Sequence, residues 1–480
     1  MVIGADFATI VPVLIVTLAA CATLLAESIR RKGDRAPVGL LALIGLGGAA
    51  VTSILQWGQN RVGFGVILAD DFSLFVNILL CGVGILTVLL SWGTAERDRL
   101  PEGEYHALML FSIVGMMLMG STRDLLIVFV ALEIMSLGVY VLTGIKRNSE
   151  AGVEGAFKYF VLGAFSSAFF LYGIALTYAA TGSTKLDEIG LAVASSVSQP
   201  DILLVLAMLL LMIGLAFKVS AVPFHMWTPD AYQGAPTLVT AFMSTGVKAA
   251  AFAAFVRIFL SAFEPMRADW VPILSAIAGL TMVLGTVVGV AQSNVKRMLA
   301  YSSIAHAGYL LVGLVAASES GKAAILLYLA AYAVTNLGAF GVLAALSSND
   351  RPHDEVRDFA GLWRERPGMA ALLTVFLLSL GGFPPTVGFI AKWYIFNAAV
   401  QQGMISLAVL GVLTSVVSVF FYLRIVVMMY MTEDNAPGQR PVAPPMVVVG
   451  LVLALLAVFY LGVQPGQIIT LAKSSVAAIF

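Results

Sequence analysis

The sequence contains little charge, few histidines and almost no cysteine. Only 11% of its 480 residues are Asp, Glu, Lys or Arg, whereas a soluble domain carries about 25%. The formal net charge is zero, so no basic field suggests nucleic acid as a partner. The two cysteines, Cys21 and Cys81, lie in separate apolar runs. We therefore expect two small apolar residues rather than a disulfide.

The usual signatures of cofactor sites are also missing. The four histidines form no HExxH motif and no CxxC pair occurs, so we expect no metal or iron–sulfur site within this chain. No Walker motif is present, and no GxGxxG follows a predicted strand. A nucleotide-binding site is therefore not expected either.

Apolar residues, by contrast, are abundant. They make up 60% of the chain, and the mean hydropathy is +0.96. No soluble core of this length encloses so much apolar surface, so we infer that the surrounding solvent is a lipid bilayer. The first residues, MVIGADF, lack a basic region and include Asp6. Residues 8–29 are therefore interpreted as a retained helix rather than a cleaved signal peptide.

The apolar runs predict an all-α, polytopic membrane protein without a separate soluble domain. A spanning helix needs about 20 mostly apolar residues, which gives about fourteen helices here. The expected spans are 8–29, 37–57, 72–94, 105–121, 124–145, 154–180, 202–222, 236–260, 271–292, 297–316, 322–346, 368–400, 404–430 and 443–463. The seventh should break at Pro223 and continue into a short segment at 224–234, and the twelfth should break at Pro384-Pro385.

Basic residues predict the orientation. Most loop Lys and Arg residues fall on one set of loop ends, which should face the cytoplasm. These residues are Arg30, Arg31, Lys32, Arg35, Arg97, Arg99, Lys146, Arg147, Lys296, Arg297, Arg351, Arg357, Arg364, Arg366 and Arg440. Both termini should then lie on the opposite side of the membrane.

Two similar segments indicate an internal duplication. VYVLTG at 139–144 matches GYLLVG at 308–313, and each half contains one proline-broken helix. We expect two inverted five-helix repeats, and interrupted helices at matching places typically mark a transport pathway. The predicted divisions are N-terminal helices 1–104, a first repeat 105–260, a second repeat 261–430, and a last helix with the C-terminus at 431–480.

Several charged residues are predicted to lie deep in the membrane, where one charge costs about 2.5–3.5 kcal/mol. Glu133 lies nine residues after Asp124, or roughly 14 Å into its helix. It is either a protonated structural carboxyl or a proton carrier paired with a lysine, for which Lys218 is the favoured partner. Lys248 lies roughly 17 Å into its helix. Lys392, after the second break, either carries protons or reaches outward to the headgroups.

Other polar residues allow two interpretations. Lys158 is only roughly 6 Å into its helix, so it either reaches the surface or bridges Glu133 to Lys218. His225, directly after the first break, could relay protons or could simply be hydrogen-bonded, and Asp230 could cap the short segment. A polar helix face either lines a half-channel or satisfies broken-helix backbone; it comprises Tyr301, Ser302, Ser303, His306 and Tyr309. Arg257 and Arg424, near helix ends, are expected to reach the headgroups.

Five segments carry a family resemblance. They are FKVSAVPFHMWTPDAYQGAPT, LEIMSLGVYVL, KYFVLGAFSSAFFLYGIAL, VKRMLAYSSIAHAGY and GGFPPTVGFIAKWYIF. Together they resemble the antiporter-like membrane subunits of respiratory complex I, most closely the subunit N family of bacterial NADH–quinone oxidoreductase. The resemblance covers essentially the whole chain. It assigns the proton relay of that family to Glu133, Lys158, Lys218, His225, Lys248 and Lys392.

The resemblance also implies the biological setting. The chain would be a non-redox subunit of a proton-translocating NADH:quinone reductase in a bacterial inner membrane. NAD, FMN, iron–sulfur clusters and quinone would belong to partner subunits, and the neighbours would be the antiporter-like subunit M and small membrane subunits such as K. Two half-channels would meet along the relay. The alternatives are a subunit of a multi-subunit sodium/proton antiporter and a membrane subunit of a hydrogenase complex.

Overall fold

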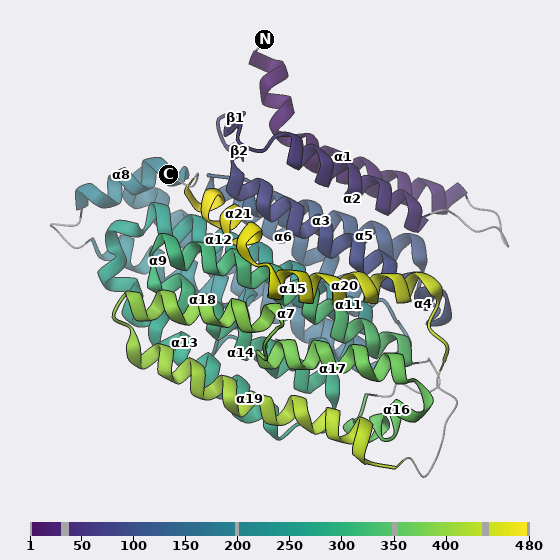
Figure 1. Ribbon diagram of the computed structural model, residues 1–480. Helices are drawn as coiled ribbons and strands as arrows, with labels where there is room; N and C mark the ends of the chain where they lie inside the picture. The colour runs from purple at the N-terminus through teal and green to yellow at the C-terminus, as the bar shows by residue number, and fades with distance from the viewer. Residues whose placement is uncertain (1, 30–37, 197–200, 348–353, 434–440, 478–480) are drawn as a thin grey trace.

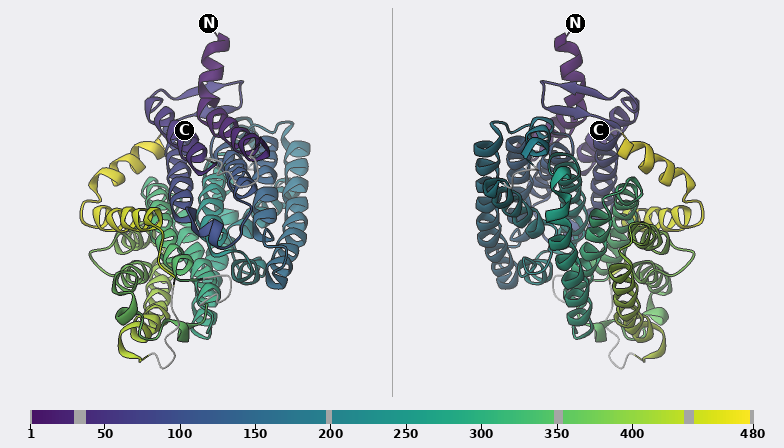
Figure 2. Two further views of the ribbon diagram at one scale, coloured as in Figure 1. Left: turned by 90° about the vertical axis from the view of Figure 1, so that its right-hand side faces the viewer. Right: turned by 90° about the vertical axis from the view of Figure 1, so that its left-hand side faces the viewer.

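The molecule is a bundle of long helices that lie side by side (Figure 1, Figure 2). The structure is a computed structural model that describes residues 2–29, 38–196, 201–347, 354–433 and 441–477. In Figure 1 most helices run across the picture, with α4 and α16 at the right-hand end and α8 at the left-hand end. Figure 2 shows the N-terminal helices at the top of the bundle and the C-terminal helices along one flank.

Twelve helices within the described residues are long and apolar enough to cross a membrane. Ten of them are single α-helices: α1 (Val2–Ile29, counted from Asp6), α2 (Val38–Leu55), α3 (Asp71–Ser91), α5 (Glu102–Gly120), α6 (Leu125–Thr143), α7 (Glu150–Thr181), α14 (Val295–Ala316), α15 (Glu319–Leu346), α19 (Ile405–Met431) and α20 (Pro445–Val463). The eleventh, Glu264–Val290, is a short 3-10 turn followed by α13 (Arg267–Val290).

The twelfth span, Thr237–Ala262, is irregular. It consists of α11 (Thr237–Phe242), a π-helical stretch Met243–Val247, α12 (Lys248–Arg257) and a second π-helical stretch Ile258–Ala262. π-helical turns occur often at functional sites because they change the direction in which the following side chains point. Here the first stretch ends directly before Lys248.

The two broken helices are present as the prolines predicted. α9 (Ile202–Lys218) is followed after eight residues by α10 (Trp227–Gly234), and α17 (Pro367–Gly381) by α18 (Val387–Gln401). Proline lacks the N–H of an α-helical hydrogen bond and clashes with the preceding turn, so both helices stop before it. The expected total of fourteen spans, their division into inverted repeats and the four-part division of the chain remain predictions.

Several short elements connect the long helices. They are a hairpin of β1 (Arg61–Gly63) and β2 (Ile67–Ala69), with Val62 opposite Leu68, together with α4 (Thr94–Arg97), α8 (Leu186–Ser196), a 3-10 turn at Val356–Phe359, α16 (Leu362–Glu365) and α21 (Gly466–Ala477). The sequence interpretation did not include the hairpin, α8 or α21. None of them has the twenty-residue apolar run by which the spans were found.

Side-chain caps fix where six of the long helices begin. An oxygen of the residue before the helix accepts a hydrogen bond from a backbone N–H of the first turn, which is otherwise unpaired. The pairs are Asp70 with Ser73 (2.8 Å), Asp124 with Leu126 (2.9 Å), Ser149 with Gly152 (3.1 Å), Asp201 with Leu203 (2.8 Å), Asn294 with Arg297 (3.0 Å) and Ser318 with Gly321 (3.1 Å).

The helices differ in how far they are enclosed. In an apolar 18-residue window of each span, all residues of Thr237–Ala262 are buried, as are 94% of those in α14 and in α15, but only 33% of those in α20. The outer helices present apolar side chains to the bilayer, whereas the inner ones contact only protein. Polar side chains on the enclosed helices α12, α14 and α15 can therefore find hydrogen-bond partners on neighbouring helices.

Candidate functional site

Three lysines inside the bundle are almost completely enclosed. Lys218 and Lys248 are each 1% exposed and Lys392 is 6% exposed. Among the described residues, none of the three lies within ion-pair distance of a carboxylate. Hydroxyl and carbonyl oxygens surround them instead. Each lysine can therefore be charged or neutral without the loss of an ion pair.

The first lysine, Lys218, contacts α6. It is the last residue of α9, and its Nζ donates to Ser136 Oγ at 2.8 Å and to Tyr140 OH at 3.1 Å. Glu133 lies on the same helix, half-buried, and its Oε1 accepts a hydrogen bond from Ser167 Oγ of α7 at 2.5 Å. Residues three and seven positions apart share one helix face. Glu133, Ser136 and Tyr140 consequently form one polar strip along α6.

The direct ion pair between Glu133 and Lys218 that the sequence suggested is therefore not formed in this structure. Within the described residues Lys218 bonds to Ser136 and Tyr140, one and two turns beyond the carboxylate. The Lys218 ammonium lies at the level of the Ser136 and Tyr140 hydroxyls, whereas the Glu133 carboxylate binds Ser167 of α7 instead. The spacing of Ser136 and Tyr140 from Glu133 was visible in the sequence and could have indicated this strip.

Side chains satisfy the backbone at the first break. Trp227 Nε1 donates to Phe217 O at 3.1 Å, and Val222 N donates to Thr281 Oγ1 of α13 at 2.9 Å. The Trp227 ring stacks on Tyr159 of α7 with centroids 3.9 Å apart. These contacts replace the hydrogen bonds that the broken helix cannot make, as a nonhelical segment in a membrane requires.

Lys158 belongs to a different, more exposed cluster. Its side chain is 42% exposed, and its Nζ lies 2.5 Å from Glu154 and 2.8 Å from Asp230 of α10. Asp230 also binds Arg297 of α14 at 2.6 Å. The bridge from Glu133 through Lys158 to Lys218 is therefore wrong for this structure, because Lys158 lies near the helix end and finds acidic partners there. Asp230 joins α7, α10 and α14.

His225 lies in the first break and is half-buried. Within the described chain its ring forms no hydrogen bond to Glu133, Lys218 or Lys248. Its role in a relay remains a prediction.

The second lysine, Lys248, contacts the polar face of α14. Its Nζ donates to the backbone oxygen of Ser303 and to Ser303 Oγ. The same hydroxyl accepts from Tyr332 OH of α15 at 2.9 Å. Ser303 thus joins α12, α14 and α15 at a single oxygen. Asn336 of α15 further holds the π-helical stretch through Ser244 Oγ at 2.6 Å.

His306, one turn beyond Ser303, joins a group of tyrosines. Its Nδ1 lies 2.6 Å from Tyr328 OH and its Nε2 lies 3.3 Å from Tyr422 OH. Tyr422 in turn lies 2.5 Å from Ser302 Oγ. The polar face expected on this helix is therefore buried and directed into the bundle, apart from the half-buried Tyr301.

The third lysine, Lys392, spans the second break. It is on α18, and its Nζ donates back to the carbonyl oxygens of Leu380 (2.8 Å) and Gly381 (3.0 Å) at the end of α17. It also donates to Ser415 Oγ of α19 at 2.7 Å, and its ammonium lies 5.4 Å from the centroid of Tyr309. Lys392 does not reach outward. It supplies hydrogen bonds to carbonyls that the break leaves without a helical partner.

Arg257 and Arg424 differ from the headgroup contacts expected for them. Arg257 is 3% exposed, and both terminal nitrogens bind Asp70, at 2.8 and 2.9 Å. Its Nε donates to Gly120 O at 3.1 Å. Arg424 donates to the backbone oxygens of Val290 and Gln292 at the end of α13. Position along a helix cannot reveal such partners, because Asp70 and Arg257 are far apart in sequence.

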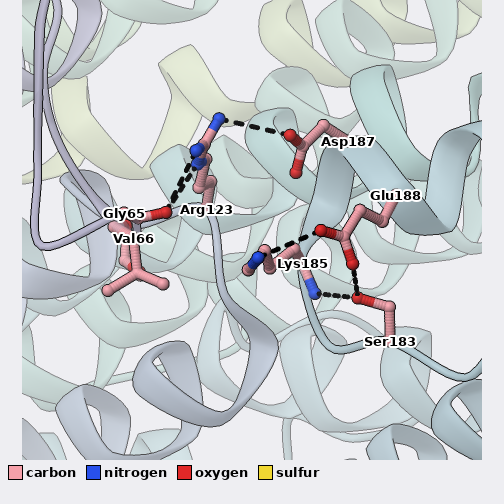
Figure 3. Close-up of polar contacts among 8 residues, drawn as sticks. Gly65, Val66, Arg123, Ser183, Lys185, Asp187 and Glu188 are labelled. Atoms are coloured by element: carbon pink, nitrogen blue, oxygen red, sulfur yellow. Dashed lines mark hydrogen bonds and ion pairs between the residues drawn. The ribbon is translucent and has the colours of Figure 1, made fainter.

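A polar cluster (Figure 3) holds α8, which lies at the end of the bundle opposite α4 and α16 (Figure 1). Arg123 donates to Gly65 O at 3.0 Å and to Asp187 at 3.2 Å. Glu188 accepts from Lys185 Nζ at 3.0 Å and from Ser183 Oγ at 2.5 Å. The hydrogen bonds from Ser183 and Lys185 lower the pKa of Glu188 from its ordinary value. α8 is thus held by charged contacts at its first turn.

Comparison with known proteins gives one consistent family. Residues 122–418 match the family model described as NADH:quinone oxidoreductase/Mrp antiporter, TM. The chain is 42% identical over 473 residues to NADH-quinone oxidoreductase subunit N of Trichlorobacter lovleyi, covering 98% of this chain and 97% of that one. It is also 42% identical over 468 residues to NADH-quinone oxidoreductase subunit N 2 of Rhizobium meliloti, covering 97% and 96%.

Solved structures agree. A chain of respiratory complex I from Thermus thermophilus has a TM-score of 0.81 and 36% identity, covering 96% of this chain and 99% of that one. A chain of the Mrp complex from Dietzia sp. has a TM-score of 0.84 but only 21% identity, covering 98% and 97%. The second likeness shows a shared fold alone.

Proposed function

The chain belongs to the NADH:quinone oxidoreductase/Mrp antiporter membrane family, among the subunit N proteins of NADH–quinone oxidoreductase, and from this premise we propose how its buried residues carry protons. It is a proton-translocating, multi-pass membrane-arm subunit of respiratory complex I. What remains to be assigned is which side chains move the proton, which subunits lie next to this one, and on which side of the membrane each terminus lies.

The observation that carries the proposal is the set of three enclosed lysines that bond only to neutral oxygens. Lys218 with Ser136 and Tyr140 forms a first station, and Lys248 with Ser303 forms a second. Lys392 with its carbonyl oxygens and Ser415 forms a third. A buried charge is costly unless it is solvated. Stations that can be either charged or neutral are suited to receive a proton and release it.

We propose that polar side chains on and around α14 connect the second and third stations. Ser303 binds Lys248, and His306 lies one helical turn further along α14 with Tyr328 and Tyr422 on its two nitrogens. A histidine both donates and accepts, so it can pass a proton between the two sides of its ring. We assign the path to Glu133, Lys218, Lys248, His306 and Lys392, with His225 as a further relay near the first break.

Lys158 enters the proposal differently. Its exposure and its contacts with Glu154 and Asp230 support a role at the mouth of the path rather than within it. The ion pairs to Asp230 hold the short helix α10 against α7 and α14.

The chain itself would carry out no redox step. We propose that NAD, FMN, iron–sulfur clusters and quinone lie in partner subunits of the complex, and that quinone reduction there changes the charge next to Glu133. The half-buried Glu133 supports a protein neighbour on this side, because a carboxylate at mid-depth cannot face lipid cheaply. The proposed neighbours are the antiporter-like subunit M and small membrane subunits such as K.

The orientation follows from the basic residues. Arg97 of α4 and Arg364 of α16 lie at one end of the bundle (Figure 1), which supports that end as cytoplasmic. Arg30, Arg31, Lys32, Arg35, Arg351 and Arg440, counted with them in the sequence, lie outside the described residues. We propose a bacterial inner membrane with both termini on the periplasmic side.

The test compares Lys218→Met, Lys248→Met and Lys392→Met in the assembled complex with Lys296→Met as control. Lys296 is also a buried lysine on a carbonyl oxygen, that of Ala235, but lies in the first turn of α14. The NADH–ferricyanide rate gives the amount of complex, and dye quenching in vesicles gives proton pumping. The three relay variants should lose about tenfold or more of pumping per complex, as expected for a lost charged group. Wild-type pumping in all three, or an equal loss in Lys296→Met, contradicts the assignment.

A further inference from the structure

The last span, α20, touches the second break without any side chain between them. Gly462 is next to the last residue of α20. A Cβ atom placed there would lie 2.1 Å from Pro385 O, 2.7 Å from Thr386 C and 2.8 Å from Val387 N. These are backbone atoms, which cannot rotate away as a side chain can. Only glycine permits this approach of two backbones.

The same break also contacts Lys392. Its ammonium binds Leu380 O and Gly381 O, and Gly382, which follows them, has a φ of 88° in the left-handed region. The segment from Leu380 to Val387 therefore contacts the Lys392 side chain near its start and the end of α20 near its end. Because the two contacts lie on one short stretch of backbone, a displacement of the break by α20 should shift the two carbonyl oxygens that hold the ammonium.

The first break is supported in another way. Its short helix α10 contacts α7, where a Cβ at Gly234 would lie 2.1 Å from Ala151 O and the Lys158–Asp230 ion pair adds a second link. α7 and α10 belong to the same predicted repeat, whereas α20 lies outside both. The second break thus depends on a helix from the C-terminal end of the chain.

We propose that Gly462 is a positioning residue for Lys392: its bare backbone sets the place of the second break and thereby the carbonyl oxygens around the lysine ammonium. The inference rests on the proposed role of Lys392 in the relay. It assigns α20, which carries no charged residue of its own, a direct mechanical part in that role.

The experiment compares Gly462→Ala with Gly466→Ala in the assembled complex. Gly466 is four residues further on, and a Cβ there would meet nothing within 4 Å. Pumping per complex is measured by dye quenching, normalised to the NADH–ferricyanide rate. Because a misplacement of about 1 Å can cost up to about a hundredfold, Gly462→Ala should lower pumping at least about fivefold. Gly466→Ala should match the wild type. Wild-type pumping in Gly462→Ala overturns the proposal.

A second measurement separates positioning from general damage. In a Lys392→Met background, Gly462→Ala should cause no further loss, because its effect passes through the lysine. An additional loss of the same size there overturns the inference. If Lys392→Met itself pumps like the wild type, the proposed relay fails rather than the contact. If Lys392→Met loses pumping while Gly462→Ala does not, only the positioning role fails.

Val458→Ala covers the case in which Gly462→Ala does not assemble. Val458 lies one turn earlier on the same face of α20 and is fully buried. Its truncation loosens α20 without a backbone clash. A loss of pumping that disappears in the Lys392→Met background supports the proposal, and wild-type pumping contradicts it.

Discussion

Asp70 and Arg257 form a two-pronged ion pair that joins the start of α3 to the end of α12, with nitrogen–oxygen distances of 2.8 and 2.9 Å. Asp70 also caps α3 through Ser73 N, and Arg257 also binds Gly120 O. Both side chains are enclosed, so their polar atoms rely on these protein partners for hydrogen bonds. The pair is a structural link beyond the relay, at the opposite end of α12 from Lys248.

Removal of one partner from this pair should destabilise the subunit strongly. A buried charge left without its partner typically costs about 3–5 kcal/mol, whereas replacement of both is often close to neutral. We expect Arg257→Met to reduce the amount of assembled complex and to lower its thermal inactivation temperature. Asp70→Asn combined with Arg257→Met should recover much of the loss. Native gels and residual activity after heating measure both effects.

Equal damage in the single and double variants would contradict this account of the pair. Pumping per assembled complex should stay near the wild-type value in each variant, because Arg257 contacts none of the three enclosed lysines.

The cluster around Glu188 should make the attachment of α8 sensitive to acid. The hydrogen bonds from Ser183 and Lys185 lower the pKa of this carboxyl in the folded protein. A carboxyl whose pKa is lowered by folding stabilises the fold above its unfolded pKa of about 4.3, and this contribution disappears as the pH falls through the folded value. Protection of the α8 amides from hydrogen exchange should therefore fall as the pH is lowered through this range.

Hydrogen exchange followed by mass spectrometry tests this, with rates corrected for the intrinsic pH dependence. Glu188→Gln should give weaker protection that no longer changes with acid. An acid response that is unchanged in Glu188→Gln would assign the effect to another group.

Sequence reasoning succeeded where a residue conflicts with its surroundings. A lysine in an apolar run or a proline within a spanning helix is costly, so Lys218, Lys248, Lys392 and both breaks could be recognised one position at a time. Partners could not be recognised in this way. Which side chain of α6 meets Lys218, Ser136 rather than Glu133, depends on how α6, α7 and α9 pack together. Asp70 meets Arg257 because α3 and α12 lie side by side.

Short elements were missed for a related reason. α8 and the hairpin of β1 and β2 are too short for an apolar span, and charged contacts such as Arg123 with Asp187 hold α8 in place. Such contacts exist only after the long helices have assembled. For Lys158 the sequence left two interpretations open, a position near the surface or a bridge between Glu133 and Lys218, and acidic neighbours near the surface bind it.

Lys158→Ala should therefore be milder than Lys218→Ala. Lys158 is 42% exposed, so water can replace its contacts with Glu154 and Asp230, and exposed ion pairs of this kind contribute little. We expect pumping per complex to fall at most about fivefold in Lys158→Ala and about tenfold or more in Lys218→Ala. The two rates are compared at equal NADH–ferricyanide activity. A larger loss in Lys158→Ala would return this residue to the interior of the path.

The hydroxyl partners of Lys218 provide the most direct test of the first station. Tyr140→Phe removes one of two hydrogen bonds to the ammonium and keeps the ring, which lies 5.3 Å from Nζ at its centroid. A hydrogen bond to a charged group contributes about 1.5–3 kcal/mol. Pumping should therefore fall about tenfold or more when the ammonium loses this partner.

Ser136→Ala should act in the same direction, since Ser136 accepts the shorter bond at 2.8 Å. Tyr159→Phe is the matched control: Tyr159 packs against Tyr140 at 4.6 Å between ring centroids and is equally enclosed, but its hydroxyl does not bind Lys218. Similar losses in Tyr140→Phe and Tyr159→Phe would indicate a packing effect. A loss confined to Ser136→Ala and Tyr140→Phe would fit the hydrogen bonds to Lys218. If neither substitution lowers pumping further in a Lys218→Met background, the effect acts through the lysine ammonium.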